Sequence, residues 1–154
     1  MKNAILTIAI LTLILTTATA QGVTVTNYIE RTTVNTKIGT AIGYAFSPNV
    51  EIGGFYQRSP VVALAEEGTT ADVENQFFGA YMTYPFIASG SAAVSLKVRT
   101  GVINNQHFMI TPSVQGSFEP IQHVKVFGDV GVRAFRPTFM AGINIRINSW
   151  NPRN

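Results

Sequence analysis

The sequence predicts an all-β fold, an eight-stranded antiparallel up-and-down β-barrel. Three observations predict it. Apolar residues recur at every second position over most of the chain, which is the period of a β-strand. Turn-forming residues separate these alternating segments. Only 12% of the 154 residues are charged, about half of the roughly 25% that an ordinary soluble domain carries.

The composition excludes several other classes of protein. The chain is 46% hydrophobic with a formal net charge of +3, so it is not a disordered polymer. It contains no cysteine, which excludes a disulfide scaffold and a cysteine–zinc module. Its pI of about 9.5 comes without any cluster of Lys and Arg, so a nucleic-acid binder is not expected. The length suits one domain.

The first twenty residues are typical of a secretory signal peptide. Lys2 supplies a positive start, residues 4–15 are almost all apolar, and Ala18-Thr19-Ala20 forms a small-residue cleavage site. An uncleaved membrane anchor is the alternative, but the apolar run is shorter than the roughly 20 residues that a spanning helix needs. We therefore expect a cleaved signal peptide over residues 1–20 and a barrel domain over residues 21–154.

The alternation after Gln21 divides into eight segments. The clearest is 94–102, where Val94, Leu96 and Val98 alternate with polar residues. The earliest segment is the weakest, so seven strands with an N-terminal tail remain an alternative. The predicted strands are 23–29, 37–46, 50–57, 77–86, 94–102, 108–118, 124–133 and 139–148.

The breaks between these segments carry turn chemistry. Compact turns are predicted at 47–49, 88–91, 104–106, 119–122 and Arg136-Pro137, and one long connection covers 59–72. Pro85 and Pro112 fall inside predicted strands. Because proline cannot donate a ladder hydrogen bond, each should mark a bulge or a strand end.

Alternation alone leaves open which face points outward. A soluble barrel would turn its apolar face inward, whereas a membrane barrel turns it toward lipid. The polar face here consists mostly of small residues with few charges, which suits a narrow interior better than a surface in water. The apolar face is free of charge along the centre of nearly every strand. Several runs also reach the roughly 9–11 residues of a membrane-spanning strand.

Aromatic residues on the apolar face gather at the strand ends. If both termini lie on the periplasmic side, one group falls at the periplasmic ends and the other near the opposite ends. This is the arrangement of two aromatic belts at the two membrane interfaces. The first group is Tyr44, Phe46, Tyr84, Phe86 and Phe118, and the second is Tyr56, Phe78, Phe108 and Phe139.

The other face holds most of the charges, and we expect them to form an interior polar network. An eight-stranded barrel is just wide enough for side chains to fill it, and buried charges are normally paired. If the last hairpin turns at Arg136-Pro137, Asp129 lies opposite Asn144 and should contact Arg146. A weak anion path is the alternative. The predicted network is Lys37, Glu51, Lys97, Arg99, Lys125, Asp129, Arg133 and Arg146.

No catalytic or metal-binding arrangement is visible in the sequence. His107 and His123 are the only histidines, and no pair of acidic residues lies near them at ligand spacing. No nucleophile, base and acid combine in a recognisable motif, and no phosphate-binding loop is present. We therefore expect no enzyme activity, no metal and no cofactor.

From these residues the chain resembles the small outer-membrane β-barrel proteins of Gram-negative bacteria, the OmpA/OmpX-like, porin-like superfamily. The resemblance covers roughly residues 23–147. It is strongest over Ile110–Phe118, which is followed by Val130-Gly131-Val132-Arg133 and the last strand. It implies an outer-membrane location and insertion by the outer-membrane assembly machinery. The chain departs from these proteins in one respect. They often end in an aromatic residue that the assembly machinery recognises, whereas Trp150 here falls on the opposite face of the strand from Ile147.

Together these features predict a transmembrane β-barrel preceded by a cleaved signal peptide and located in the outer membrane. We expect a monomer in the outer-membrane lipid bilayer with a structural or surface-interaction role and a filled polar interior. The connection 59–72 is either a solvated loop or a contact surface for a partner, and no nucleic-acid partner is expected. Two alternatives are a secreted soluble lipocalin-like barrel that binds a small apolar ligand, and a narrow anion-preferring channel.

Overall fold

The computed structural model describes residues 20–33, 35–46, 50–60 and 76–147. Its eight strands form one closed antiparallel barrel in sequence order. Among these residues no helix is long and apolar enough to cross a membrane. The strands are β1 (Ala20–Thr32), β2 (Thr36–Phe46), β3 (Val50–Arg58), β4 (Gln76–Ser89), β5 (Ala92–Ile103), β6 (His107–Ile121), β7 (Val124–Arg133) and β8 (Arg136–Ile147).

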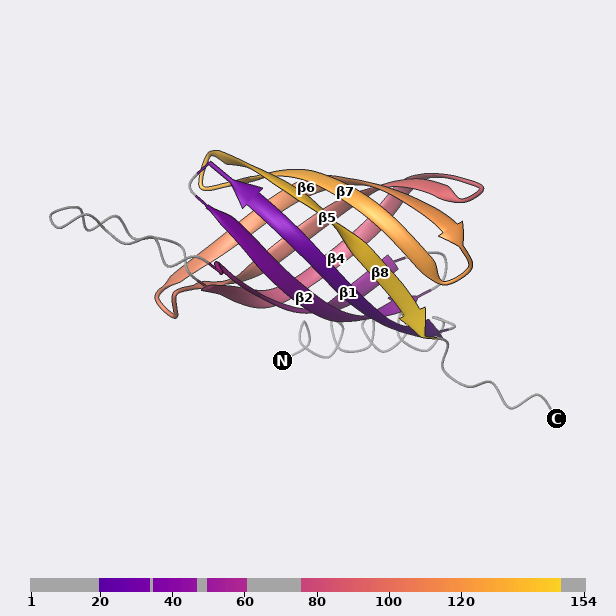
Figure 1. Ribbon diagram of the computed structural model, residues 1–154, viewed down its shortest axis with the longest axis horizontal. Coiled ribbons are helices and arrows are strands. Elements are labelled where there is room, and N and C mark those ends of the chain that lie inside the picture. The colour runs from indigo at the N-terminus through magenta and orange to yellow at the C-terminus, as the bar shows by residue number, and fades with distance from the viewer. Residues whose placement is uncertain (1–19, 34, 47–49, 61–75, 148–154) are drawn as a thin grey trace, which may run out of the picture.

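The first strand closes the barrel. β1 pairs with β2 along one edge and with β8 along the other. Its pairing with β8 is continuous, from Val23 opposite Ile147 to Thr32 opposite Thr138. The start of β1 and the finish of β8 therefore lie at the same end (Figure 1), which we call the terminal end. The other end, where β3 leads into the long connection, is the loop end. The predicted eight-stranded fold is confirmed, and the seven-stranded alternative is wrong.

Side chains alternate between the lumen and the outside along every strand, and the apolar set points outward. Ile42, Met82 and Val130 are 62%, 47% and 56% exposed. The buried set is mostly polar, and its largest fully buried members include Arg99, Arg133 and Lys37. A lipocalin-like barrel needs the opposite orientation, with an apolar lining, so that alternative is wrong.

Three of the turns differ in position from the sequence prediction. β4 continues to Ser89 and turns at Gly90-Ser91, and β6 continues to Ile121 and turns at Gln122-His123. The β7–β8 turn is Ala134-Phe135, not Arg136-Pro137, because Arg133 pairs directly with Arg136. Both turn residues have positive φ, 47° and 63°, as a two-residue type I′ hairpin turn requires. The predicted turn at 47–49 lies outside the described residues.

The two strand prolines lie where pairing changes. The β4–β5 register shifts between Pro85 and Ile87, which is the expected bulge. Pro112 still pairs with Val98 of β5, but the β6–β7 ladder begins only at Ser113. Each proline therefore stands beside an interruption of one ladder, in keeping with its missing N–H.

Glycines on the inner face let large side chains and neighbouring backbones approach closely. A Cβ at Gly39 would overlap the ring of Tyr28. Gly79 of β4 and Gly101 of β5 lie directly opposite each other, and a Cβ on Gly79 would overlap the Thr100 carbonyl oxygen. A side chain at Gly79 is therefore excluded by backbone atoms that cannot rotate away.

Gly79→Ala should destabilise the barrel by about 1–3 kcal/mol, the usual cost of overpacking. The matched control is Gly116→Ala, because a Cβ there has no heavy atom within 4 Å. Unfolding in a urea series, followed by the difference in gel migration between heated and unheated protein, measures both variants. Equal stability of the two variants would contradict the packing described at Gly79.

Candidate functional site in the barrel lumen

The structure places the predicted interior residues on the lumen side of their strands. Lys97 and Asp129 lie near the middle, while Glu51, Lys125 and Arg146 lie toward the terminal end. Lys125 and Arg146 are half-buried. The buried members are Lys37, Glu51, Lys97, Arg99, Asp129 and Arg133.

The charge cluster nearest the loop end centres on Glu30, a residue that the sequence prediction did not include. Arg99 Nη2 lies 2.5 Å from Glu30 Oε2 in a buried ion pair. Arg133 Nη2 lies 2.8 Å from both Glu30 oxygens and donates a hydrogen bond to Oε2. Glu30 is 0% exposed and the two arginines 1% and 2%. One carboxylate therefore serves two buried guanidinium groups.

Neutral groups complete the coordination of this cluster. Gln57 Nε2 donates to Glu30 Oε1 at 2.8 Å, and Gln57 Oε1 accepts from Arg99 Nη1 at 3.2 Å and from the Tyr28 hydroxyl at 3.1 Å. Arg133 Nε donates to Thr111 Oγ1 at 3.0 Å. The cluster thus draws on strands β1, β3, β5, β6 and β7 and ties opposite sides of the barrel together.

Aromatic rings cover the two guanidinium groups. Arg133 lies 4.4 Å from the ring centre of Phe77, and Arg99 lies 5.8 Å from that of Phe55. The two rings meet edge to face at 4.8 Å. Arginine is suited to such stacking because its charge is planar and weakly hydrated. Ring faces and carboxylate together replace the water that the arginines lose.

A second charged pair lies near the middle of the lumen. Lys97 Nζ sits between two rings, 5.2 Å from the centre of Tyr81 and 5.1 Å from that of Phe127. It is close enough to Asp129 for the two charges to interact. Asp129 Oδ2 accepts a hydrogen bond from Ser113 at 3.0 Å. The other carboxylate oxygen, Oδ1, is buried without a hydrogen-bond partner, so the charge of Asp129 is balanced chiefly by the nearby Lys97.

Glu51 organises the third cluster, toward the terminal end. It accepts hydrogen bonds from Thr24 at 2.8 Å and from the Tyr81 hydroxyl. Asn144 Nδ2 lies 3.3 Å and 3.4 Å from the two Glu51 oxygens and donates to Thr26 Oγ1 at 2.8 Å. These three donors, Thr24, Tyr81 and Asn144, are all neutral.

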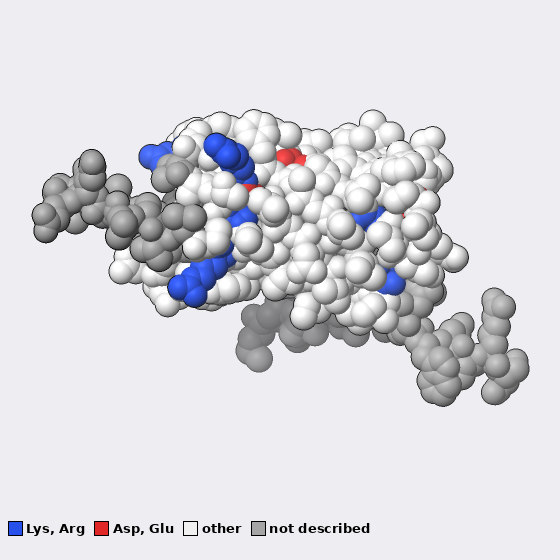
Figure 2. All heavy atoms as spheres, in the orientation of Figure 1, with Lys and Arg blue, Asp and Glu red and all other residues white. Residues whose placement is uncertain are grey.

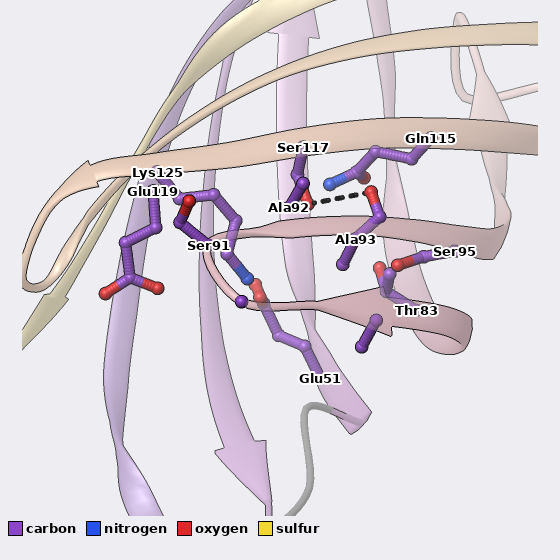
Figure 3. A pocket seen from close by; sticks show the side chains of 12 residues that line it. Glu51, Thr83, Ser91, Ala92, Ala93, Ser95, Gln115, Ser117, Glu119 and Lys125 are labelled. Carbon is purple, nitrogen blue, oxygen red and sulfur yellow. Dashed lines mark hydrogen bonds between the residues drawn. The ribbon is translucent and has the colours of Figure 1, made fainter.

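Beyond Glu51 the lumen opens into a small polar cavity of about 60 Å³ at the terminal end. Figure 3 shows side chains from the ends of several strands around it, with Lys125 extending toward Glu51. Gln115 lines this cavity, and its Oε1 is buried with no hydrogen-bond partner. A space of this size and polarity accommodates water molecules.

The predicted contact between Asp129 and Arg146 is wrong. The turn at Ala134-Phe135 puts Asp129 opposite Met140, whereas Lys125 is the residue opposite Asn144. Met140 and Arg146 are six residues apart on β8, or roughly 20 Å at the usual rise of a strand. Moving the turn by two residues shifted the whole register and removed the contact.

Glu30 was missed because the first strand was predicted to stop at Ile29. The signal was present: Thr24, Thr26, Tyr28 and Glu30 continue one face at period two. Extending the segment by one residue would have found it. With Glu30 included, the interior acids are Glu30, Glu51 and Asp129 instead of two, so the lumen is less positive than the sequence prediction had it.

The predicted belt residues all lie on the outer wall, defined as the side chains that point away from the lumen. Tyr44 and Phe46 are half-buried against each other, with ring centres 5.1 Å apart. In Figure 2, most Lys and Arg side chains lie near the loop end, on the left, and the rest of the visible face shows only small patches of charge. The remaining belt residues are exposed: Tyr56, Phe78, Tyr84, Phe86, Phe108, Phe118 and Phe139.

Several predicted features lie outside the described residues. They are the signal peptide up to residue 19, most of the connection 59–72, and Trp150. Within the described ranges no group of His, Asp or Glu is arranged to hold a metal ion.

The fold is that of small transmembrane β-barrels, as comparison with solved structures shows. No family model and no curated protein sequence matches the chain. A de novo designed transmembrane β-barrel aligns with a TM-score of 0.66 at 12% identity, over 82% of this chain and 96% of that one. A second design, TMB2.3, has the same TM-score at 11% identity, over 84% and 97% of the two chains.

A natural protein shares the architecture. The N-terminal β-barrel domain of Pseudomonas aeruginosa OprF aligns with a TM-score of 0.57 at 13% identity, over 82% of this chain and 98% of that domain. The resemblance to small outer-membrane barrels predicted from the sequence is thus matched in three dimensions. At these identities the likeness establishes the fold.

Glu30→Gln should destabilise the protein by roughly 3–5 kcal/mol, because it leaves two buried arginines without a counter-charge. The matched control is Glu119→Gln. Glu119 is only part-buried, and its Oε1 accepts a hydrogen bond from the His123 backbone N–H, which an amide oxygen can also accept. Urea unfolding in detergent micelles measures both variants. A Glu30→Gln variant as stable as the Glu119→Gln control would show that the cluster does not hold the fold.

Proposed function

We propose that the protein is an integral outer-membrane β-barrel with a structural or surface-interaction role, a filled polar lumen and no catalytic activity. The observation that carries this proposal is the inversion of the barrel. Its apolar side chains face outward, while Arg99, Arg133, Lys37 and Glu30 are buried inside. Such a molecule needs an apolar solvent around it, and a bilayer supplies one.

The dimensions of the outer wall support the same location. On β4 the charge-free stretch of the wall runs from Phe78 to Phe86, and aromatic residues stand at both of its ends. Closure through β1 and β8 leaves no unpaired strand edge, which is the condition for a sheet to cross hydrocarbon.

Packing of the lumen supports a closed barrel over a channel. The Glu30 cluster joins side chains from five strands, and Phe77, Gln57 and Thr111 around it are fully buried. Moving an ion past this level would separate Glu30 from Arg99 and Arg133. The cavity beyond Glu51 is only about 60 Å³. We therefore expect the anion-preferring channel, the remaining alternative, to be absent.

The proposal that the protein is not an enzyme rests on the surroundings of its two histidines. Among the described residues neither imidazole makes a hydrogen bond or an ion pair, so neither histidine is oriented as a general base toward a nucleophile. His107 is exposed at the start of β6, and His123 is a turn residue with φ of 73°.

A lysine in the middle of the outer wall distinguishes a membrane barrel from a barrel in water. Met82→Lys should lower stability in vesicles by about 2–4 kcal/mol, whereas Ile121→Lys, at the terminal end, should cost about 0–1 kcal/mol. Both positions are exposed, 47% and 67%. Urea unfolding of the vesicle-reconstituted protein measures the difference. Equal, near-zero effects would contradict the membrane location.

The orientation and the closed lumen can be tested together. An epitope inserted within 61–75 should be labelled on intact cells, whereas one inserted at Gly90-Ser91 should be labelled only after the outer membrane is permeabilised. Planar-bilayer recordings of the purified protein should show no stable conductance. Labelling of the Gly90-Ser91 epitope on intact cells would reverse the orientation, and an anion-selective conductance would overturn the closed lumen.

A further inference from the structure

The charges on the outer wall are confined to one end. Among the described residues only Arg31 and Arg58 combine a charged side chain with an outward position on a strand, and both are exposed. Both stand at the loop end, as the last outward-facing residue of β1 and the last residue of β3. The terminal end of the wall carries no charge in the described part of the chain.

The two arginines are neighbours across β2. Arg31 is paired with Thr36 of β2, and Arg58 with Ile38. Two strand spacings and a two-residue offset put their Cα atoms roughly 12 Å apart. Both side chains are exposed, and neither makes an ion pair or hydrogen bond with another described residue, so no described residue competes with an outside partner for either guanidinium group.

The surroundings of Arg58 describe the partner. A shallow groove of about 420 Å³ beside it is lined by Ile38, Ser59 and Pro60. Tyr56 precedes Arg58 on the same face and is 44% exposed, so apolar wall, aromatic ring and guanidinium follow one another toward the loop end. This is the sequence of environments from acyl chain to headgroup.

We propose that Arg31 and Arg58 bind the phosphate groups of lipid headgroups in the leaflet that surrounds the loop end. The planar guanidinium donates paired hydrogen bonds to phosphate oxygens, and Ile38 between the two arginines contacts the acyl chains below. The proposal rests on the membrane location proposed above. The barrel would thereby prefer anionic lipids with exposed phosphate groups, at one end only.

The test compares vesicles of phosphatidylcholine with the same vesicles containing phosphatidic acid. Added phosphatidic acid should raise the midpoint temperature at which the unheated band disappears by roughly 4–8 °C. Arg31→Gln combined with Arg58→Gln should abolish most of that rise, and added salt should weaken it in the wild type. Both side chains are exposed and neither makes an ion pair with a described residue, so the double variant should fold normally.

Arg136→Gln is the matched control. Arg136 is also exposed at the loop end. It lies directly opposite the lumen-facing Arg133 in the β7–β8 ladder, so it shares the lumen-facing parity. This variant should keep the full response to phosphatidic acid. Equal responses of the double variant and the wild type would overturn the proposal, as would an equal loss in Arg136→Gln. Failure of the wild type to insert into either vesicle would instead refute the membrane location.

Discussion

Pairing of β1 with β8 is the constraint on which the rest of the structure depends. It converts a sheet with two free edges into a barrel with none, and only a closed sheet satisfies its own backbone in an apolar solvent. Closure also fixes which residues share the lumen. Glu30 enters that lumen on β1, the strand whose sequence pattern is weakest, and brings the carboxylate that two arginines on later strands require.

The lumen shows how a narrow barrel accommodates charge without water. Three of the buried cations show two kinds of environment: Arg99 and Arg133 share Glu30, and Lys97 lies between two rings beside Asp129. Leaving any one of them uncompensated in such a medium would be expensive. Interior glycines such as Gly39 make the space for the tyrosines that complete the networks. The same residues therefore fill the lumen and compensate its buried charges.

Most of the fold could be predicted from the sequence. The two faces of each strand meet different surroundings, so apolar and polar residues must alternate with a period of two. The eight strands, their outward apolar face and the effect of Pro85 on pairing all follow from that rule. The register of β7 against β8 was predicted less accurately. The Ala134-Phe135 turn has neither of the residues that normally mark a type I′ hairpin, Asn and Gly, so Arg136-Pro137 gave the stronger signal. The misplaced turn put Asp129 opposite Asn144 in the predicted register, whereas it lies opposite Met140. The predicted contact with Arg146 was therefore wrong.

The contact between Arg133 and Glu30 also has a kinetic meaning. It joins residues 103 positions apart, so it cannot form until nearly the whole chain is present and the last strands meet the first. Contacts between such distant residues are slow to form because the intervening chain must be ordered first. An unclosed barrel would hold Arg99 and Arg133 without their shared acid. The cluster therefore stabilises the closed barrel relative to open forms in which these arginines lack a counter-charge.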